Sequence, residues 1–268
     1  MSQTADLTPG ARLAAMRAGA PLVHNITNYV AMNVMANALL AAGASPAMVH
    51  AREEAAGFAA IAAALTVNIG TLSPPWAEAM EAAAASAVAH GKPWVLDPVA
   101  VFASPYRTEV CARLVALSPT VIRGNASEIL ALAGGTAGAA GADAGDEVSA
   151  AEAGARALAL RSGAVVAVTG PVDFLTDGSR AFRVANGHAL MPKVTALGCS
   201  LTGVVAAFVA TGEDPLAATA AALAFYGLAG ERAATGAAGP GSFAVAFIDA
   251  LHALSPADLD AGARIETA

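Results

Sequence analysis

Short apolar runs alternate along this chain with longer alanine-rich stretches, and this alternation limits the possible folds more than any other feature. The clearest runs are Ala47–Val49, Leu65–Ile69, Trp94–Leu96, Thr120–Ile122 and Val165–Val168. Strands that alternate with helical segments form parallel sheets, because each helix returns the chain to the same edge of the sheet. The pattern therefore predicts an α/β fold with a central, mostly parallel sheet and helices on both faces.

The composition fits one large α/β unit. Of the 268 residues, 56% are hydrophobic but only 5% are aromatic, so alanine, valine and leucine must fill the core. Sheets with helices on both faces often reach this length, and we expect a single domain over residues 1–268, without a separate lid domain. Residues 256–268 show little apolar periodicity, which predicts a frayed tail.

Further elements follow from local patterns. Phe174–Thr176 and Ala181–Val184 flank a turn-forming segment and predict a β-hairpin. The Gly- and Ala-rich stretch Ala133–Ala150 predicts a loop before a helix over Ser149–Arg161. The apolar stretches Leu201–Ala210 and Ala217–Leu228 are shorter than the roughly 20 residues that cross a bilayer, so they predict buried helices.

Charge and cysteine content restrict the possible partners. The net charge is −7 with only 14 Lys and Arg residues, which argues against nucleic acid and an anionic membrane as partners. The two cysteines, Cys111 and Cys199, lack the spacing of a zinc site or a disulfide framework. The segment Met1–Ala20 lacks the continuous apolar core of a signal peptide, so we expect a cytoplasmic protein.

Polar and glycine residues follow each predicted strand. They are His50, Gly70-Thr71, Asp97-Pro98, Arg123-Gly124-Asn125 and Thr169-Gly170. The carboxyl ends of parallel strands share one edge of a sheet, and ligands of open α/β sheets bind at that edge. The sequence therefore predicts one common ligand site there.

The segment Val194–Gly203 is the strongest chemical signal, because a turn of small residues leads into the apolar helical stretch Val204–Ala210. The amino terminus of a helix offers free N–H groups and favours negative charge, so this turn can hold an anion such as a phosphoryl group. The same field should lower the pKa of Cys199, whose thiolate could then accept a proton. The alternative is a buried structural cysteine.

Charged and amide side chains near the other strand ends suggest metal and phosphate contacts. Asn125 and Glu128 form an N-x-x-E pattern whose oxygens suit Mg²⁺, although an N-cap and its capping box explain the same pattern. Asp97 could bind the same ion or simply initiate a turn with Pro98. Arg123 is placed to reach a phosphate, and its alternatives are a solvated charge or a salt bridge to Glu128. For Thr169 the alternative is a plain turn.

The Gly-Cys turn resembles the anion-hole motif of ribokinase-like kinases, in which Gly-Asp is more usual, and cysteine at this position is typical of the hydroxyethylthiazole kinase family. Other stretches are similar to that family nearly end to end: Pro21–Val30, Gly43–Met48, Leu65–Leu72, Val95–Val99 and Ile122–Glu128. One departure is Ala196-Leu197-Gly198, where related kinases often carry Gly-x-Gly. Ala196 adds a Cβ close to the expected phosphate path.

The resemblance implies a ribokinase-like fold and ATP-dependent phosphorylation of the hydroxyl group of 4-methyl-5-(2-hydroxyethyl)thiazole, a step of thiamine biosynthesis or salvage. In this scheme Cys199 is the general base. Arg123 and Thr169 contact ATP, and Asp97 and Glu128 hold Mg²⁺ through water molecules.

The resemblance also implies the substrate contacts and the assembly. Asn25, Met48 and Gly198 are the expected substrate-binding residues, with the Met48 thioether packed on the thiazole ring. A homotrimer is expected, with sites at the subunit interfaces, so that Met48 and Cys199 act across an interface.

Two other functions stay open on the sequence alone. One is a ribokinase-like dehydratase that uses ATP or ADP to remove water from a nicotinamide-nucleotide hydrate, although its sites usually resemble Gly-Asp. The other is a non-catalytic small-molecule-binding relative. The joint presence of Asp97, Arg123, Glu128 and Cys199 argues against the latter.

Overall fold

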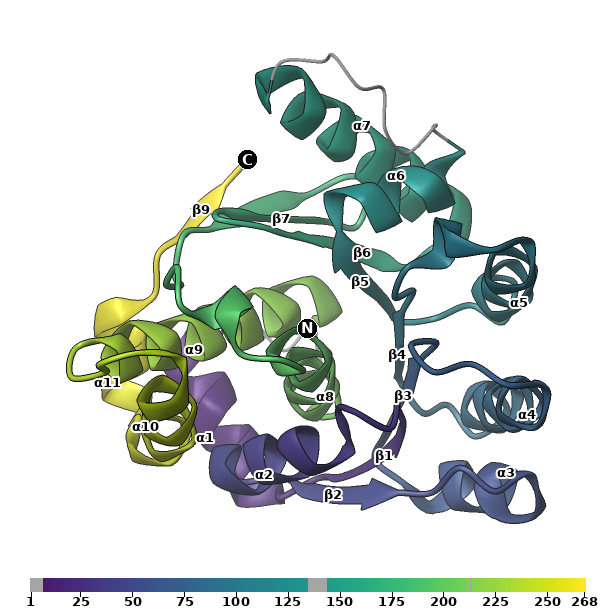
Figure 1. Cartoon of the computed structure of the whole chain (residues 1–268), viewed down its shortest axis with the longest axis horizontal. Coiled ribbons are helices and arrows are strands. Elements are labelled where there is room, and N and C mark those ends of the chain that lie inside the picture. The colour runs from purple at the N-terminus through teal and green to yellow at the C-terminus, as the bar shows by residue number, and fades with distance from the viewer. Residues whose placement is uncertain (1–6, 135–143, 213) are drawn as a thin grey trace, which may run out of the picture.

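A computed structural model describes residues 7–134, 144–212 and 214–268, and within them nine strands form one sheet in the order β2-β1-β3-β4-β5-β6-β7-β8-β9 (Figure 1). The strands are β1 (Leu22–Ile26), β2 (Ser45–Met48), β3 (Ala64–Asn68), β4 (Trp94–Asp97), β5 (Val121–Asn125), β6 (Val165–Thr169), β7 (Asp173–Thr176), β8 (Ala181–Val184) and β9 (Ile265–Thr267). The strands β2 to β6 in this order pair in parallel, and β7, β8 and β9 pair antiparallel. The predicted α/β fold with a mostly parallel sheet is confirmed.

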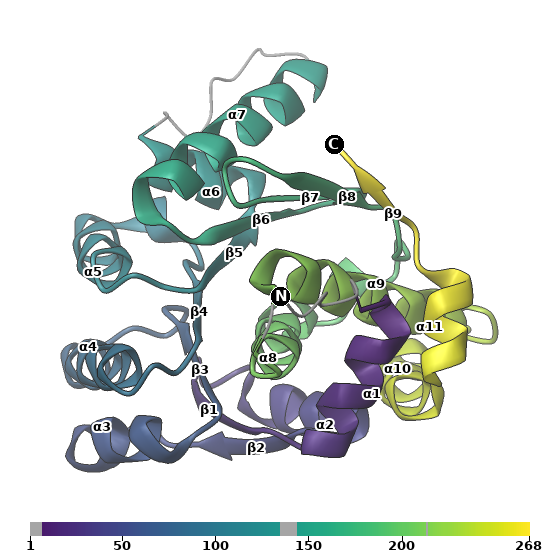
Figure 2. The same ribbon diagram turned by 180° about the vertical axis from the view of Figure 1, so that it is seen from behind.

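Helices cover both faces of the sheet (Figures 1 and 2). On one face lie α3 (Arg52–Ile61), α4 (Pro74–Ala89), α5 (Pro105–Val115), α6 (Ala126–Ala133) and α7 (Ala144–Ser162). On the other lie α1 (Pro9–Gly19), α2 (Met32–Ala42), α8 (Leu197–Val209), α9 (Pro215–Ala234), α10 (Pro240–Ala253) and α11 (Pro256–Gly262). Two short 3-10 turns, η1 (Val101–Ala103) and η2 (Met191–Lys193), follow strands β4 and β8.

Alternation along the buried strands divides the core into two layers. In β6, Val165 and Ala167 join the cluster of α8 and α9, whereas Val166 and Val168 join the cluster of α4 to α7. Successive side chains of a strand point to opposite faces, so a strand buried on both sides must be apolar throughout. This explains why such short runs could be recognised in the sequence.

Helix α8 lies at the centre of the layer that also contains α2 and α9. Apart from Gly198 and Cys199, all its residues are buried. The helix begins at Leu197, so the predicted turn over Val194–Gly203 is for the most part helix. Small residues are present because other helices approach closely: a Cβ on Gly203 would lie 2.8 Å from Met35 Cε of α2. The buried helices expected over Leu201–Ala210 and Ala217–Leu228 are confirmed.

Several predicted boundaries change. Strand β1 was not predicted, because His24 and Asn25 interrupt its apolar pattern, yet both side chains are buried. Helix α7 begins at Ala144 within the predicted loop Ala133–Ala150, whose residues 135–143 lie outside the described part. The predicted hairpin is confirmed as β7 and β8.

The frayed tail predicted for residues 256–268 is wrong. Ser255 and Asp258 form a capping box that starts α11, and β9 pairs with β8 along the edge of the sheet. The loop before β9 is also tied down, because Arg264 N donates to Asn186 Oδ1 at 2.8 Å. Backbone pairing and caps hold this segment more than apolar burial, so it carries little hydrophobic periodicity.

Helix α1 packs against α11 and α9, far along the chain. Thr8 Oγ1 and Gly10 N both donate to the Asp260 carboxylate, at 3.0 and 2.7 Å. Among the described helices, none combines the length and the apolar character needed to cross a membrane.

Close packing at Gly227 of α9 generates a test of this arrangement. A Cβ there would lie 2.5 Å from the backbone oxygen of Asn186, in the loop after β8. We expect Gly227→Ala to lower the free energy of unfolding by about 1–3 kcal/mol, because a backbone atom must move. The matched control is Gly57→Ala on exposed α3, where an added Cβ meets nothing within 4 Å. It should stabilise by about 0.5–1 kcal/mol, as measured by urea denaturation.

Candidate active site

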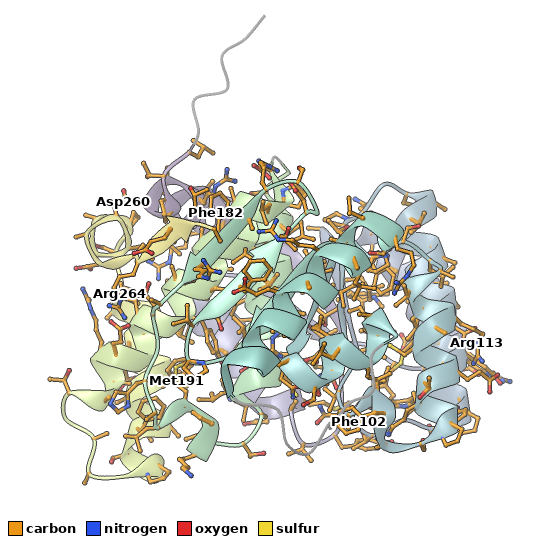
Figure 3. The ribbon with its side chains drawn as sticks, turned by 90° about the horizontal axis from the view of Figure 1, so that it is seen from above. Phe102, Arg113, Phe182, Met191, Asp260 and Arg264 are labelled. Carbon is orange, nitrogen blue, oxygen red and sulfur yellow. The ribbon has the colours of Figure 1, made fainter. Side chains whose placement is uncertain are left out.

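The carboxyl ends of the parallel strands and the amino terminus of α8 meet along one edge of the sheet. In Figure 3, Phe102 of η1, after β4, and Met191 of η2, after β8, lie along the same margin of the molecule. A cavity of about 880 Å³ opens beside Met191, at the start of α8. Its lining includes Arg123, Thr169 and Gly198, three residues that the sequence predicted for the site.

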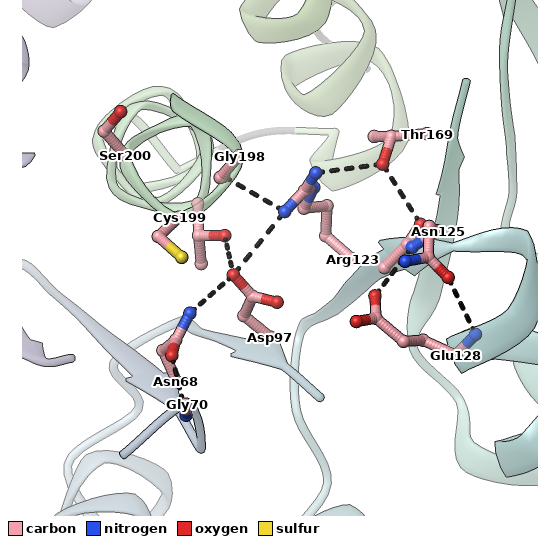
Figure 4. A network of polar contacts seen from close by, with 12 residues as sticks. Asn68, Gly70, Asp97, Arg123, Asn125, Glu128, Thr169, Gly198, Cys199 and Ser200 are labelled. Atoms are coloured by element: carbon pink, nitrogen blue, oxygen red, sulfur yellow. Dashed lines mark hydrogen bonds and ion pairs between the residues drawn. The ribbon is translucent and has the colours of Figure 1, made fainter. Parts of the chain in front are cut away.

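Arg123, near the end of β5, joins three elements of this edge (Figure 4). Its Nη2 donates to Thr169 Oγ1 at 2.9 Å, and its Nη1 donates to the Gly198 carbonyl oxygen at 3.0 Å. Asp97 Oδ2 is 3.5 Å away, and the expected alternative of a salt bridge to Glu128 is not formed. The guanidinium therefore stands at the wall of the cavity with two neutral partners and a long ion pair to Asp97.

Asp97, the last residue of β4, is 1% exposed. Its Oδ2 accepts from Asn68 Nδ2 at 2.8 Å and from Thr202 Oγ1 at 2.9 Å, whereas its buried Oδ1 has no partner among the described residues. Burial raises the pKa of Asp97 to about 6; Glu128 adds to this, and Arg123 opposes it. A carboxylate held this way is a good candidate to meet a cation with its free oxygen.

Glu128 is structural as well as close to Asp97. Asn125 caps α6 and Glu128 Oε2 accepts from Asn125 N at 2.8 Å, so the capping box expected as the alternative is present. Glu128 Oε1 accepts from Ala100 N at 3.0 Å. Both oxygens therefore have backbone partners. A carboxylate oxygen carries more than one lone pair, so it can still accept a hydrogen bond from a metal-bound water.

Cys199 lies in the first turn of α8, with its Sγ 3.3 Å from Asn28 Nδ2. The expected lowering of its pKa is wrong. Burial and the Asp97 carboxylate raise the pKa of the thiol, although Asn28, Asn68 and Arg123 oppose the rise. With its pKa raised, the thiol form of Cys199 predominates at neutral pH in the free protein.

The first turn of α8 is held from both sides. Ser200 Oγ is 2.6 Å from the Tyr226 hydroxyl, and that hydroxyl donates to the Leu197 carbonyl oxygen at 2.8 Å. Before the turn, Ala196 adopts φ 66° and ψ 0°, the left-handed conformation that glycine adopts more easily. This is the position at which the family resemblance leads us to expect glycine.

Of the three predicted substrate residues, only Gly198 lies in this cluster. Asn25 Nδ2 donates to the Val23 and Ala47 carbonyl oxygens, and its Oδ1 accepts from Thr66, so its polar atoms are used within the sheet. Met48 is half-buried on β2, the edge strand, and does not line the cavity.

Sequence reasoning missed several residues of this cluster. Asn28 links Asn68 Oδ1 and the Cys199 thiol, and Thr202 holds Asp97 from one turn further along α8. Arg107 of α5 donates to the Ile69 and Val99 carbonyl oxygens and so joins the turns after β3 and β4. Asn68 is the last residue of β3 and lies within the predicted run Leu65–Ile69, and Asn28 follows β1, which was not predicted. The available signal was therefore the polar amide of Asn68 within an apolar run. For Arg107 the sequence carries none.

The arrangement can bind a phosphorylated ligand and place a proton acceptor beside it. Arg123, Thr169 and the unpaired amides of the first turn of α8 supply donors and positive charge at one end of the cavity. Cys199 stands on the same turn, and the unpartnered oxygen of Asp97 lies nearby. Such a site is that of a phosphoryl-transfer enzyme of the α/β class.

Comparison with known proteins supports this class and narrows it. The pyridoxal kinase of Staphylococcus aureus, in complex with AMP-PCP and pyridoxal, superposes with a TM-score of 0.63 at 16% identity over 92% of this chain and 98% of that chain, which shows the ribokinase-like fold. The hydroxyethylthiazole kinase protein of Pyrococcus horikoshii OT3 superposes with a TM-score of 0.89 at 41% identity, covering 97% of this chain and 98% of that chain.

The sequence comparisons agree. The model of the hydroxyethylthiazole kinase family matches residues 13–257. Hydroxyethylthiazole kinases of Cereibacter sphaeroides (strain ATCC 17025) and Rhizobium leguminosarum bv. trifolii are 70% identical over 259 residues and 64% identical over 262 residues, each alignment covering 97% of this chain and 98% of the relative. The chain therefore belongs to the hydroxyethylthiazole kinase family, and it is a phosphotransferase.

The backbone at Ala196 generates a test of strain at the site. Ala196→Gly should leave the free energy of unfolding unchanged or raise it by up to about 1 kcal/mol, because glycine relieves the left-handed conformation but adds freedom to the unfolded chain. Ala112→Gly, the same exchange on exposed α5, should lose about 1 kcal/mol. Equal losses in the two variants, measured by chemical denaturation, would show that Ala196 is unstrained.

Proposed function

We propose that the chain transfers the γ-phosphoryl group of ATP to the hydroxyl group of 4-methyl-5-(2-hydroxyethyl)thiazole, a step of thiamine biosynthesis or salvage. The observation that carries the proposal is the meeting of Cys199, Arg123 and Thr169 at the amino terminus of α8, in a chain 70% identical to a hydroxyethylthiazole kinase. Family membership does not favour the dehydratase. We take residues 1–268 as one cytoplasmic kinase domain.

In the proposed reaction ATP occupies the 880 Å³ cavity with its phosphates toward Arg123 and Thr169. Charge-assisted bonds are stronger than neutral ones, so a phosphate oxygen can replace the neutral partners that Arg123 holds in the free protein. The amides of Gly198 and Cys199 then face the group in transfer. Catalysis of phosphoryl transfer rests on such positioning and charge stabilisation.

Cys199 is proposed as the general base. Its thiol stands on the first turn of α8, so an alcohol bound beside that turn could give its proton to the sulfur while attacking phosphorus. Asn28 Nδ2 donates to this sulfur at 3.3 Å and favours its thiolate form. The raised pKa of Cys199 means that the fraction of active base grows as pH rises above neutrality.

Mg²⁺ fits the carboxylates of this edge. Asp97 Oδ1 has no partner within residues 7–134, 144–212 and 214–268, whereas Glu128 already accepts from two backbone amides. Asp97 is therefore the candidate for contact, and Glu128 would act through water. No group of three His, Cys, Asp or Glu side chains gathers in the described chain, but Mg²⁺ needs only one or two carboxylates beside phosphates and water. Bound there, it neutralises phosphate charge; its chelation should abolish turnover.

A homotrimer with shared substrate sites is the proposed assembly. Met48 lies on edge strand β2, and Tyr29 and Val30, after β1, expose 65% and 59% of their surface. If a neighbouring copy covered this apolar surface, the Met48 side chain of one copy would lie near the substrate held beside Cys199 of the other copy. Sedimentation equilibrium, which gives the number of subunits directly, tests this assembly.

A coupled assay of ADP release tests the proposed function. With the thiazole alcohol as acceptor, ADP and the thiazole phosphate should form in equal amounts, whereas pyrimidine and sugar alcohols should support much slower release. Formation of ADP without phosphorylated thiazole, or preference for another alcohol, would contradict the proposed substrate.

Replacement of Cys199 tests the base. Cys199→Ala should slow turnover by about 10²–10⁴-fold while ATP still binds, as measured by calorimetry. The rate of the wild-type enzyme should rise with pH above neutrality, because the thiol must lose its proton and its pKa is raised. Cys199→Asp should stay active and lack this rise, since a carboxylate is already ionised there. Wild-type turnover in the Ala variant would exclude the base role.

A further inference from the structure

A buried carboxylate lies in the wall of the cavity, outside the cluster of Cys199 and Arg123. Asp173 is the first residue of β7 and is 8% exposed. It is the one Asp or Glu among the described residues that line the cavity. Gly170 N donates to its Oδ1 at 2.9 Å, and Oδ2 has no hydrogen-bond partner in the described part of the chain. Oδ2 of Asp173 therefore stays available to accept a hydrogen bond from a ligand.

The sheet fixes where along the cavity this carboxylate stands. Because β7 runs antiparallel to both β6 and β8, the first residue of β7 lies at the same edge as the last residues of its two neighbours. Asp173 pairs with Val184, and its chain neighbour Phe174 pairs with Val168. Asp173 thus lies between the Arg123–Thr169 end of the cavity and the part lined by Asn186 to His188.

The parts of a nucleotide follow one another in the same order as these three parts of the cavity. Phosphates match the end with Arg123, Thr169 and the amides of α8, which supply positive charge and hydrogen-bond donors. The ribose comes next and carries two hydroxyl donors side by side. An ionised carboxyl group only accepts hydrogen bonds, and carboxylates bind ribose hydroxyls in this way in dinucleotide-binding folds.

The ionisation of Asp173 is consistent with a group that accepts hydrogen bonds. Burial raises its pKa to about 6, against the Gly170 amide and Arg123, which lower it. The group is therefore mostly ionised at neutral pH.

We propose that Asp173 accepts hydrogen bonds from the ribose hydroxyls of the bound nucleotide and makes the enzyme select ribonucleotides over deoxyribonucleotides. This inference rests on the proposed binding of ATP in this cavity. It concerns a binding contact and leaves the chemical step to the residues at the start of α8.

The test compares ATP with 2′-deoxy-ATP and 3′-deoxy-ATP in the wild type, Asp173→Asn and Asp173→Ala. A hydrogen bond to a charged group contributes about 1.5–3 kcal/mol, so the wild-type kcat/KM should fall about 10–100-fold for at least one deoxynucleotide. Asp173→Ala should lower kcat/KM for ATP by the same factor and leave that analogue unaffected. Asp173→Asn keeps an acceptor oxygen and should retain part of the preference.

Controls separate the possible causes of failure. Asp249→Ala removes an exposed carboxylate of α10 and should leave the preference unchanged. If Asp173→Ala does not fold, the Asn variant and the wild-type comparison still decide. Calorimetry with ADP and both deoxy-ADPs measures nucleotide binding without any alcohol, so loss of the proposed thiazole activity would not hide the result. Equal use of ATP and both analogues by the wild type, or unchanged preference in Asp173→Ala, would overturn the proposal.

Discussion

The burial of helix α8 is the constraint on which the rest of this structure depends. The helix is enclosed by the sheet, α2 and α9, and only Gly198 and Cys199 escape burial. A buried helix end leaves backbone N–H groups without partners unless something supplies them. Here the end opens on the cavity, while Ser200 and Tyr226 hold the first turn and Thr202 joins it to Asp97. One rigid element therefore sets the position of the thiol, the anion site and the carboxylate together.

The electrostatics of the site leave its charged groups available to a ligand. Asp97 accepts from two neutral donors and pairs with Arg123 only at 3.5 Å, so its charge is partly compensated. Arg123 is held mainly by the Gly198 carbonyl and the Thr169 hydroxyl. Neutral partners are exchanged more readily than a close ion pair, which keeps the guanidinium available to phosphate. Burial, together with the Asp97 carboxylate, raises the pKa of Cys199.

The sequence predicted those parts of the molecule that follow from apolar runs and from the polar residues that end them. Strands buried on both faces were visible as apolar runs, and the polar residues after them do meet at one edge, as Arg123, Thr169, Asp97 and Glu128 show. Prediction failed where tertiary contacts replace local pattern. Polar His24 and Asn25 lie inside β1 because neighbouring strands satisfy them. The pKa of Cys199 depends on burial and on Asp97, which no local pattern reveals.

The contacts between the two ends of the chain also bear on how the molecule forms. Helix α1 packs on α9 and α11, and β9 completes the sheet beside β8 while Arg264 anchors the loop at Asn186. During synthesis, α1 (Pro9–Gly19) can pack only after α9, from Pro215, and α11, from Pro256, have been made. The outer edge of β8 likewise stays open until β9 (Ile265–Thr267) follows. Contacts so distant in sequence slow folding and leave a strand edge open to other chains in the meantime. A growing chain of this kind would benefit most from chaperone protection late in translation.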